Sequence, residues 1–250
     1  MTLKNIAVCI NQVPDTASGI EVVHGNPDIG YLNKVLNPYD EYAIEEAVRL
    51  KERLGEVMVT AFSVGDKKHY DVLRKALSMG ADRACLVDGG RRDDSRSVAA
   101  SLDKAIRFHY DGFPDLVVCG RESSDCNRAQ VPLMLAEMLG VAAVAAVTEL
   151  MYEDGVLRVW REIEGGMEEY VLYPPALISA EKGLNIPRKT NIKAVMKARK
   201  EPILHIDGSV EIASGVAYRG FSTIRRQKNC RIMETAEDLV RILHEERRIL

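Results

Sequence analysis

The sequence predicts an α/β fold in which a mostly parallel sheet is covered by helices on both faces and extended by β-hairpins. Over roughly the first 150 residues, short apolar runs alternate with segments of helical period, the pattern of strands joined by crossover helices. Over 149–178, apolar and polar residues alternate, and turn signals at Asp154-Gly155 and Gly165-Gly166 indicate two β-hairpins. Residues 183–250 are too apolar for a free tail but carry too few apolar side chains to form a core alone, which indicates a segment that packs onto another structure.

Each expected element has its own signal. Ile6-Ala7-Val8-Cys9-Ile10 is a continuous apolar run, as in a strand buried on both faces. Asn37-Pro38 opens a helix, because Asn caps helices and Pro fits their first position. Gly80 ends a helix as a C′ glycine. We expect strands at 4–13, 57–64, 84–87, 116–119 and 141–147, helices from 37 onward and at 67–79, 95–110, 128–139 and 235–247, and a basic, weakly structured stretch at 182–200.

Composition narrows the function classes. Hydrophobic residues make up 46% and charged residues 28%, which is typical of a globular protein. The net charge of -3 gives no support to nucleic-acid binding. Five scattered cysteines without a CxxC pair, and an N-terminus that enters an apolar strand at once, predict a cytoplasmic protein without a targeting segment. The longest apolar run, 141–147, is far too short for membrane insertion.

A ligand site is expected where the strands end. In an open parallel sheet, ligands bind outside the carboxyl ends of the strands, near the switch point in strand order. The ends Cys9-Ile10-Asn11, Ser63-Val64-Gly65 and Cys119-Gly120-Arg121 carry small or polar residues. The last continues through a polar loop into a helix N-terminus, whose free N–H groups favour anionic oxygen. The alternative is a polar loop with capping residues and no ligand.

Several common motifs are absent. No GxGxxG follows the first strand, so the nicotinamide-dinucleotide fingerprint is missing. The sequence also lacks GxxxxGK[ST] and GxSxG, which disfavours a P-loop enzyme and an α/β-hydrolase. Its five histidines show no metal-ligand spacing, so no metal site is expected.

Five segments, in matching order and spacing, resemble the beta subunit of electron transfer flavoproteins. The resemblance runs over residues 5–201 and thins beyond them. The segments are Asn-Pro-Tyr-Asp-Glu-Tyr-Ala-Ile-Glu-Glu-Ala-Val-Arg-Leu-Lys-Glu at 37–52, Ala-Leu-Ser-Met-Gly-Ala-Asp-Arg at 76–83, Val-Trp-Arg-Glu-Ile-Glu-Gly-Gly-Met-Glu at 159–168 with Pro175-Ala176, Leu-Asn-Ile-Pro-Arg at 184–188 and Met-Lys-Ala-Arg-Lys at 196–200.

That resemblance implies a Rossmann-like sheet of the adenine-nucleotide alpha-hydrolase type and an electron carrier that is not an enzyme by itself. It implies a nucleotide-binding domain over 1–182, a recognition loop at 183–200 and an arm at 201–250 that contacts an alpha subunit. This chain would bind AMP or a second FAD and share the redox FAD with that subunit. The implied nucleotide contacts are Cys9, Asn37, Pro38, Tyr39, Asp40, Val64, Gly120, Arg121, Glu122, Ser123, Ser124, Asp125, Cys126, Asn127, Arg128, Ala129, Gln130 and Val131.

The resemblance also implies protein partners. An acyl-CoA-type dehydrogenase would dock on Ile192, Lys193, Met196, Lys197 and Lys200, with Ile192 as the apolar plug. A quinone oxidoreductase or a similar acceptor would receive the electrons. Simple transfer and flavin-based bifurcation both stay open, although the Asn-Pro-Tyr-Asp and Ala-Gln-Val forms resemble the bifurcating branch somewhat more.

The binding loop departs from the family pattern at several positions. Glu122 and Ser124 stand where an amide and an apolar residue are expected, and Cys126 and Pro132 are unusual there. Glu122 adds negative charge near a phosphate site, which weakens anion binding unless Arg121 or Arg128 offsets it.

Two other nucleotide-binding classes share the sheet type. A universal-stress-like ATP or AMP module carries a glycine-rich phosphate loop late in the chain, and none is evident here. An ATP-pyrophosphatase needs an SGGxDS-like loop after the first strand, where this chain reads Asn11-Gln12-Val13-Pro14-Asp15.

Overall fold

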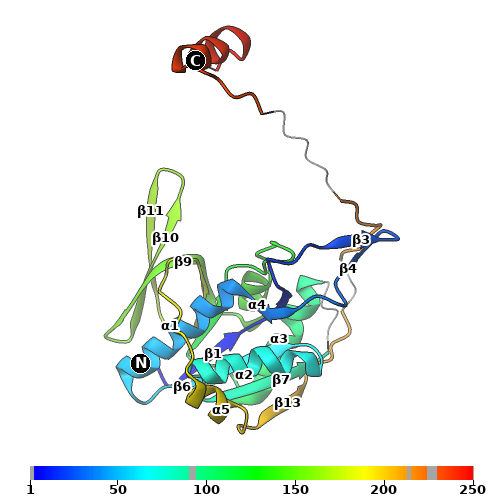
Figure 1. The fold of residues 1–250 in the computed structure, drawn as a ribbon. Helices are drawn as coiled ribbons and strands as arrows, with labels where there is room; N and C mark the ends of the chain where they lie inside the picture. Colours follow the sequence, from blue (N-terminus) through cyan, green and yellow to red (C-terminus); the bar gives the residue numbers. More distant parts are fainter. Residues whose placement is uncertain (1–2, 90–93, 213–214, 224–229, 250) are drawn as a thin grey trace. The chain divides into compact units, whose positions relative to one another are not determined.

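The computed structural model describes residues 3–89, 94–212, 215–223 and 230–249. Two compact units are present: Met1–Ile20 with Ile29–Arg219, and Glu21–Asp28 with Gly220–Leu250. The second unit holds the short pair β3 (Glu21–Val23) and β4 (Asn26–Asp28), α6 (Ala236–Arg241) and a π-turn at Ile242–Glu246. The larger unit holds the sheet and the candidate site (Figure 1).

A nine-stranded sheet in the order β11-β10-β9-β12-β8-β1-β6-β7-β13 forms the centre of this unit. Neighbouring strands in the stretch β9-β12-β8-β1-β6-β7-β13 of this order are parallel. The remaining pairs, β9–β10 and β10–β11, are antiparallel. The bounds are β1 Asn5–Cys9, β6 Met58–Val64, β7 Arg83–Asp88, β8 Leu116–Gly120, β9 Ala142–Glu153, β10 Val156–Ile163, β11 Gly166–Leu172, β12 Ala176–Ala180 and β13 Ile203–Asp207; β2 Gln12–Pro14 and β5 Lys34–Leu36 form a separate pair.

Helices cover both faces of the parallel part. Ile6 and Val8 of β1 belong to the core cluster that contains the apolar side chains of α1 (Pro38–Leu54) and α2 (Tyr70–Met79). Ala7 and Cys9, which alternate with them, belong to the cluster of α3 (Ser95–Tyr110) and α4 (Val131–Leu139). Because successive strand residues point to opposite faces, the apolar run of β1 serves two layers. The predicted doubly covered α/β sheet is confirmed.

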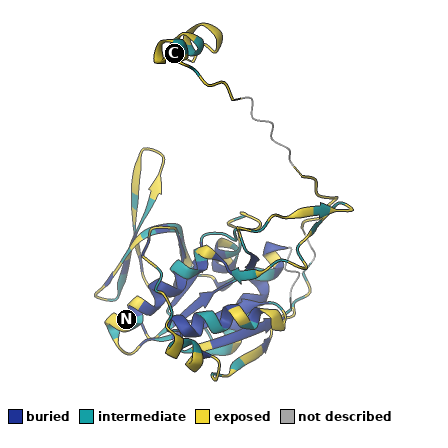
Figure 2. Ribbon diagram, viewed as in Figure 1, coloured by how far each residue is buried: buried dark blue, intermediate teal, exposed yellow. Residues whose placement is uncertain are grey.

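The two hairpins are also confirmed. The antiparallel pairs β9–β10 and β10–β11 turn at Asp154-Gly155 and at Gly165, and all three of these residues have positive φ. We call β10, β11 and the second half of β9 the ribbon. Figure 2 shows that the outer part of the ribbon is largely exposed, in contrast with the buried central strands.

Three elements differ from the sequence-based expectation. The alternating pattern predicts a hairpin that continues to residue 178, but Ala176–Ala180 form the fully buried strand β12, which lies between β9 and β8. Strand β13 is not among the expected strands, because as an edge strand it is only partly buried and has no continuous apolar run. Residues 192–198 form α5 (Ile192–Ala198), capped by Asn191, inside the stretch expected to be weakly structured.

Helix boundaries follow local chemistry. Helix α3 occupies the predicted range 95–110, with Asp94 as its N-cap. Helix α4 begins at Val131, three residues later than expected, because residues 121–130 form a folded loop. Across the described part of the chain, no helix combines the length and the apolar character that a bilayer span requires.

Candidate functional site

The candidate site lies at the switch point of the sheet. Strand β1 lies between β6 and β8, and the chain reaches β6 and β7 first and crosses back to β8 afterwards. The carboxyl ends of β1 and β8 are adjacent there, with Cys9 opposite Cys119. A cleft opens beyond these ends, as the topology predicts.

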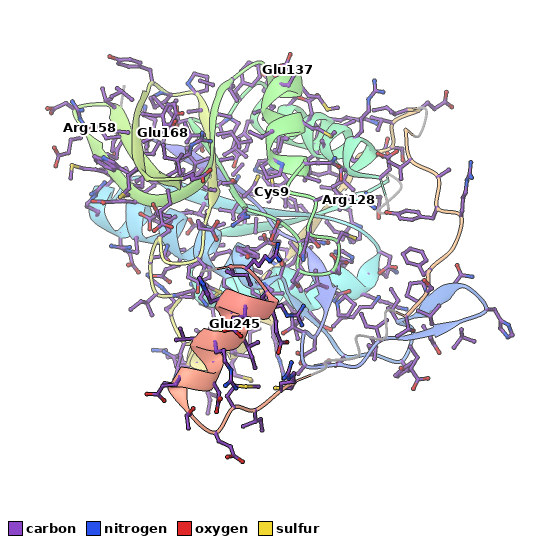
Figure 3. All side chains as sticks on the ribbon, turned by 90° about the horizontal axis from the view of Figure 1, so that it is seen from above. Cys9, Arg128, Glu137, Arg158, Glu168 and Glu245 are labelled. Carbon is purple, nitrogen blue, oxygen red and sulfur yellow. The ribbon has the colours of Figure 1, made fainter. Side chains whose placement is uncertain are left out.

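The cleft has an empty volume of about 870 Å³ counted out to its mouth. Figure 3 labels Cys9 at the end of β1 and Arg128 on the loop before α4, which both line it. The lining residues are Cys9, Ile10, Asn11, Asn37, Asp40, Val64, Ser95, Val98, Leu102, Cys119, Gly120, Glu122, Ser123, Asp125, Cys126, Arg128, Ala129, Gln130, Val131 and Pro132.

Most of the residues expected at the nucleotide are brought together in this cleft. Helix α1 and its N-cap contribute Asp40 and Asn37, and β6 contributes Val64. The lining does not include five of the expected residues, namely Pro38, Tyr39, Arg121, Ser124 and Asn127. Sequence reasoning missed the α3 wall of the cleft, which is formed by Ser95, Val98 and Leu102. An apolar stripe on a helix predicts that the helix packs on the sheet, but it does not show which of its residues line a cleft.

Asn37 attaches the loop that follows β8 to α1. It occupies the N-cap position, yet its side chain makes no capping hydrogen bond. Instead, its Nδ2 donates to the Glu122 carbonyl at 2.9 Å and to Asp40 Oδ1 at 2.9 Å, while its Oδ1 accepts from the Ser124 amide at 3.1 Å. The Asn-Pro pair therefore starts α1 and also fixes the loop that follows β8.

Asp40 is a buried carboxyl at the centre of the switch point. Its Oδ2 accepts from the Asn11 amide at 2.6 Å, and its carboxyl also accepts from the Gly120 amide. It therefore connects α1 to the ends of both central strands. Burial raises the pKa of Asp40 to about 7; the hydrogen bonds from Asn11, Asn37 and Gly120 act in the opposite direction but are outweighed.

Gly120 is required by this close approach. A Cβ at position 120 would lie 2.8 Å from the Tyr39 carbonyl carbon and closer still to Asp40 Oδ1. Both separations are far inside van der Waals contact, and the first atom belongs to the backbone. Only glycine therefore lets β8 end against the first turn of α1.

The loop 121–130 is folded by its own backbone. The Ser123 carbonyl accepts from the amides of Cys126 at 3.3 Å and Asn127 at 2.7 Å. Asn127 and Ala129 both have positive φ, which is uncommon for residues other than glycine. Gln130, at the N-cap of α4, makes no side-chain capping bond. The first turn of α4 thus faces the cleft without a side-chain cap from Gln130.

The two arginines of the loop take different positions. Arg121 turns to Glu181, at 2.5 Å from Nη1 to Oε2, and is not part of the lining. Arg128 does line the cleft, where its guanidinium carbon lies 5.4 Å from the centre of the Tyr218 ring. Arg121 Nε also lies 4.0 Å from Glu122 Oε2, so Arg121 is the cation that offsets this carboxylate. Arg128 is the one of the two arginines that lines the cleft.

The Cys119 thiol at the base of the cleft is a poor nucleophile. Cys9 and Cys119 are 6% and 4% exposed. A hydrogen bond with Cys9, together with burial, raises the pKa of the Cys119 thiol well above its usual value. A thiol held in this form stays protonated at neutral pH, so it provides polar but uncharged surface. Within the described residues, no group of three or more His, Cys, Asp or Glu side chains could hold a metal ion.

The expected docking residues lie far along the chain from this cleft, on and just after α5. Ile192 at its first turn is 83% exposed and Met196 is 50% exposed. Lys193, Lys197 and Lys200 are also exposed. The segment therefore presents apolar and basic side chains to solvent.

Comparison with known proteins identifies the family. A family model described as the electron transfer flavoprotein domain matches residues 31–210. The chain belongs to the electron transfer flavoprotein family. The electron transfer flavoprotein beta subunit of Syntrophomonas wolfei is 34% identical over 203 residues, covering 81% of this chain and 79% of the relative. Those of Thermoanaerobacterium thermosaccharolyticum and Megasphaera elsdenii are 38% and 33% identical, covering 78% and 87% of this chain and 74% and 83% of the relatives.

The match to electron transfer flavoproteins agrees with the site geometry. The matched range contains α1, β8 and the loop 121–130, which together form most of the cleft. The sequence resemblance to the beta subunit of this family is confirmed, and the universal-stress and pyrophosphatase alternatives are set aside.

Proposed function

We propose that this chain is the electron transfer flavoprotein subunit that binds an adenine nucleotide, AMP or FAD, in the switch-point cleft. With an alpha subunit that carries the redox FAD, it takes electrons from an acyl-CoA-type dehydrogenase and passes them to a quinone oxidoreductase or a similar acceptor. Flavin-based bifurcation is the variant of this role in which the cleft holds FAD. The arm 201–250, parts of which lie outside the described residues, contacts the alpha subunit in this proposal.

The observation that carries the proposal is the cleft itself. Its base carries uncharged thiols and its α3 wall supplies Val98 and Leu102, which suit a flat purine ring. Its lining also includes the first turn of α4 and Arg128, which suit a phosphate. The carboxylates of Glu122 and Asp125 belong to the same lining and can accept hydrogen bonds from ribose hydroxyls.

Identifying the bound nucleotide tests this proposal directly. The chain is co-expressed with an electron transfer flavoprotein alpha subunit, and the purified complex is extracted with acid and chromatographed. One FAD plus one AMP per complex supports a simple carrier, and two FAD support a bifurcating one. A complex that releases no nucleotide beyond a single FAD contradicts nucleotide binding by this chain.

The loop arginines provide a matched pair of variants. Arg128→Gln removes the cation in the cleft, whereas Arg121→Gln removes a cation of the same loop that is paired with Glu181 outside the lining. Because a charge-assisted hydrogen bond contributes about 1.5–3 kcal/mol, we expect Arg128→Gln to weaken nucleotide binding by about 10- to 100-fold. Arg121→Gln should have a much smaller effect. Equal losses in the two variants would contradict a phosphate at Arg128.

Docking of the dehydrogenase is tested at Ile192. Ile192→Asp places a charge at the exposed end of α5, and Phe108→Asp makes the same change at a 77% exposed position of α3, on the other face of the sheet. For an interface hot spot we expect the KM for the dehydrogenase to rise about tenfold or more in the first variant only. Unchanged kinetics in Ile192→Asp would remove the docking assignment.

A further inference from the structure

The segment from Asn185 to Arg199 is held at both of its ends by the helices beneath it. At its start, Asn185 Nδ2 donates to the Tyr42 carbonyl at 3.0 Å and to Glu46 Oε2 at 2.9 Å. Both acceptors belong to α1, and the Asn185 side chain is buried against them. The chain is therefore fixed to α1 before the exposed part of the segment begins.

Arg188 strengthens this attachment by contacting two carboxylates of α1. Its Nε and Nη2 donate to the two oxygens of Glu45 at 2.8 and 3.1 Å, and its Nη1 and Nη2 donate to the two oxygens of Glu52 at 2.6 and 3.0 Å. Its backbone amide also donates to Glu45 at 3.1 Å. Two helical turns separate Glu45 from Glu52, so both lie on one face of α1.

The electrostatic setting of Arg188 agrees with a permanent contact. The Glu45 side chain is 6% exposed and that of Glu52 is 57% exposed, so one carboxylate is buried and the other faces solvent. The hydrogen bonds to Glu52 and Glu45 raise the pKa of the Arg188 guanidinium, and its hydrogen bond lowers the pKa of Glu52. A planar guanidinium can pair with two carboxylates at once in this geometry, which a compact ammonium group cannot reproduce.

The far end of the segment is held by a different arginine. Arg74 of α2 donates from Nη1 to the carbonyls of Ala198 and Arg199, both at 2.8 Å. These carbonyls lie at the C-terminus of α5, where unpaired carbonyls attract a cation. The segment thus has one arginine contact near each end, one to α1 and one from α2.

Helix α5 lies between these two attachments, and its orientation depends on contacts with the rest of the chain. Helix α5 has seven residues, and a helix of that length is unstable without tertiary contacts. Its side chains Ile192 and Met196 are separated by one helical turn and are both exposed, so they lie on one outward face. The direction of that face is therefore set by tertiary contacts, namely the packing of α5 on α2 through the buried Ala198 and the attachments at the two ends of the segment.

We infer that Arg188 is a positioning residue that, by bridging Glu45 and Glu52, fixes the orientation of the Ile192–Met196 face toward a partner protein. The existence of a partner protein rests on the proposed function. The fixed orientation of the face does not, because it depends only on contacts within this chain. Arg188 is engaged within the chain, so it does not serve as a steering charge, a role left to exposed lysines such as Lys193.

Hydrogen exchange tests the positioning in the complex co-expressed with an alpha subunit. Arg188→Met removes the bridge to Glu45 and Glu52. Lys189→Met is the matched control, because it removes one positive charge at the next position, which is exposed. We expect amides 189–199 to exchange about tenfold faster or more in Arg188→Met and at the wild-type rate in Lys189→Met. Arg188→Lys should recover only part of the protection. Wild-type exchange in Arg188→Met overturns the inference.

A milder variant and a kinetic readout complete the test. If Arg188→Met does not fold, Glu52→Gln provides a milder variant, because it changes only the exposed half of the bridge. We expect a smaller rise in the exchange rate of amides 189–199 in this variant. An exchange rate equal to that of the wild type would overturn the inference. In folded Arg188→Met, the KM for the dehydrogenase should rise while kcat and nucleotide content stay unchanged. If Ile192→Asp leaves KM unchanged, docking on this face fails, but the exchange result still decides the role of Arg188.

Discussion

Replacing Asp40 by Asn should remove a pH dependence of stability that originates at the switch point. Asp40 is 4% exposed, and its burial raises its pKa from 3.8 to about 7 in the folded chain. In the unfolded chain the carboxyl ionises near its ordinary pKa. Folding therefore opposes ionisation of Asp40 at any pH above that value.

The sign and the size follow from the two pKa values. The stability associated with protonated Asp40 is complete below about pH 4, falls as pH rises, and is lost by about pH 7. The difference of roughly 3 in pKa, at 1.36 kcal/mol for each pKa unit, corresponds to about 4 kcal/mol. The free energy of unfolding of Asp40→Asn, compared with wild type, should rise by about this amount between about pH 4 and pH 8.

Urea unfolding at a series of pH values measures this difference. All other titrating groups are shared by the two proteins, so their contributions cancel. The Asn amide group also faces donors from Asn11, Asn37 or Gly120, which adds a constant cost but no pH dependence. Glu41→Gln, the next residue of the same helix turn, is the control. A wild-type-minus-variant difference that is independent of pH would refute the reasoning.

Three further changes have definite expected outcomes. Gly120→Ala should destabilise the fold by about 1–3 kcal/mol and weaken binding of the proposed nucleotide, because the added Cβ meets Asp40 and backbone; thermal unfolding and nucleotide content measure the two effects. Ala146→Val should cost about 1–2 kcal/mol, since Ala146 has φ of 57° within β9, and a matched Ala143→Val should not show that backbone cost. Leu157→Ala should cost about 2–5 kcal/mol by urea unfolding, because Leu157, on β10 of the ribbon, is fully buried.

The parallel core was predictable because its signals are local. The continuous apolar run of β1 and the position of Asp94 at the start of α3 are readable from neighbouring residues alone. Ala176–Ala180 carries a similar apolar run, but the alternating hairpin before it favoured an extension of that pattern. Strand β13 depends on pairing with β7, more than 100 residues away, so its short and partly exposed sequence gives no clear signal.

The candidate site was predictable in position more than in detail. Topology and family resemblance both pointed to the ends of β1, β6 and β8. The side-chain partners of Asn37 and Arg121 were not readable from sequence. Asn37 gives up its capping bond for contacts with residues 85 and 87 positions away, and Arg121 pairs with Glu181, 60 positions away. Such long-range polar partners follow from the fold and not from local propensity.

The path of β9 has a practical consequence for studying the complex. Its first half pairs with β12 in the parallel core, and its second half pairs with β10 in the ribbon. At the junction, the Ala146 amide donates to the Ser179 hydroxyl at 2.9 Å. Because one strand is hydrogen-bonded into both parts, the tip near Gly165 turns together with the sheet. A fluorescent or spin label at that tip should therefore report the orientation of the sheet in the larger unit.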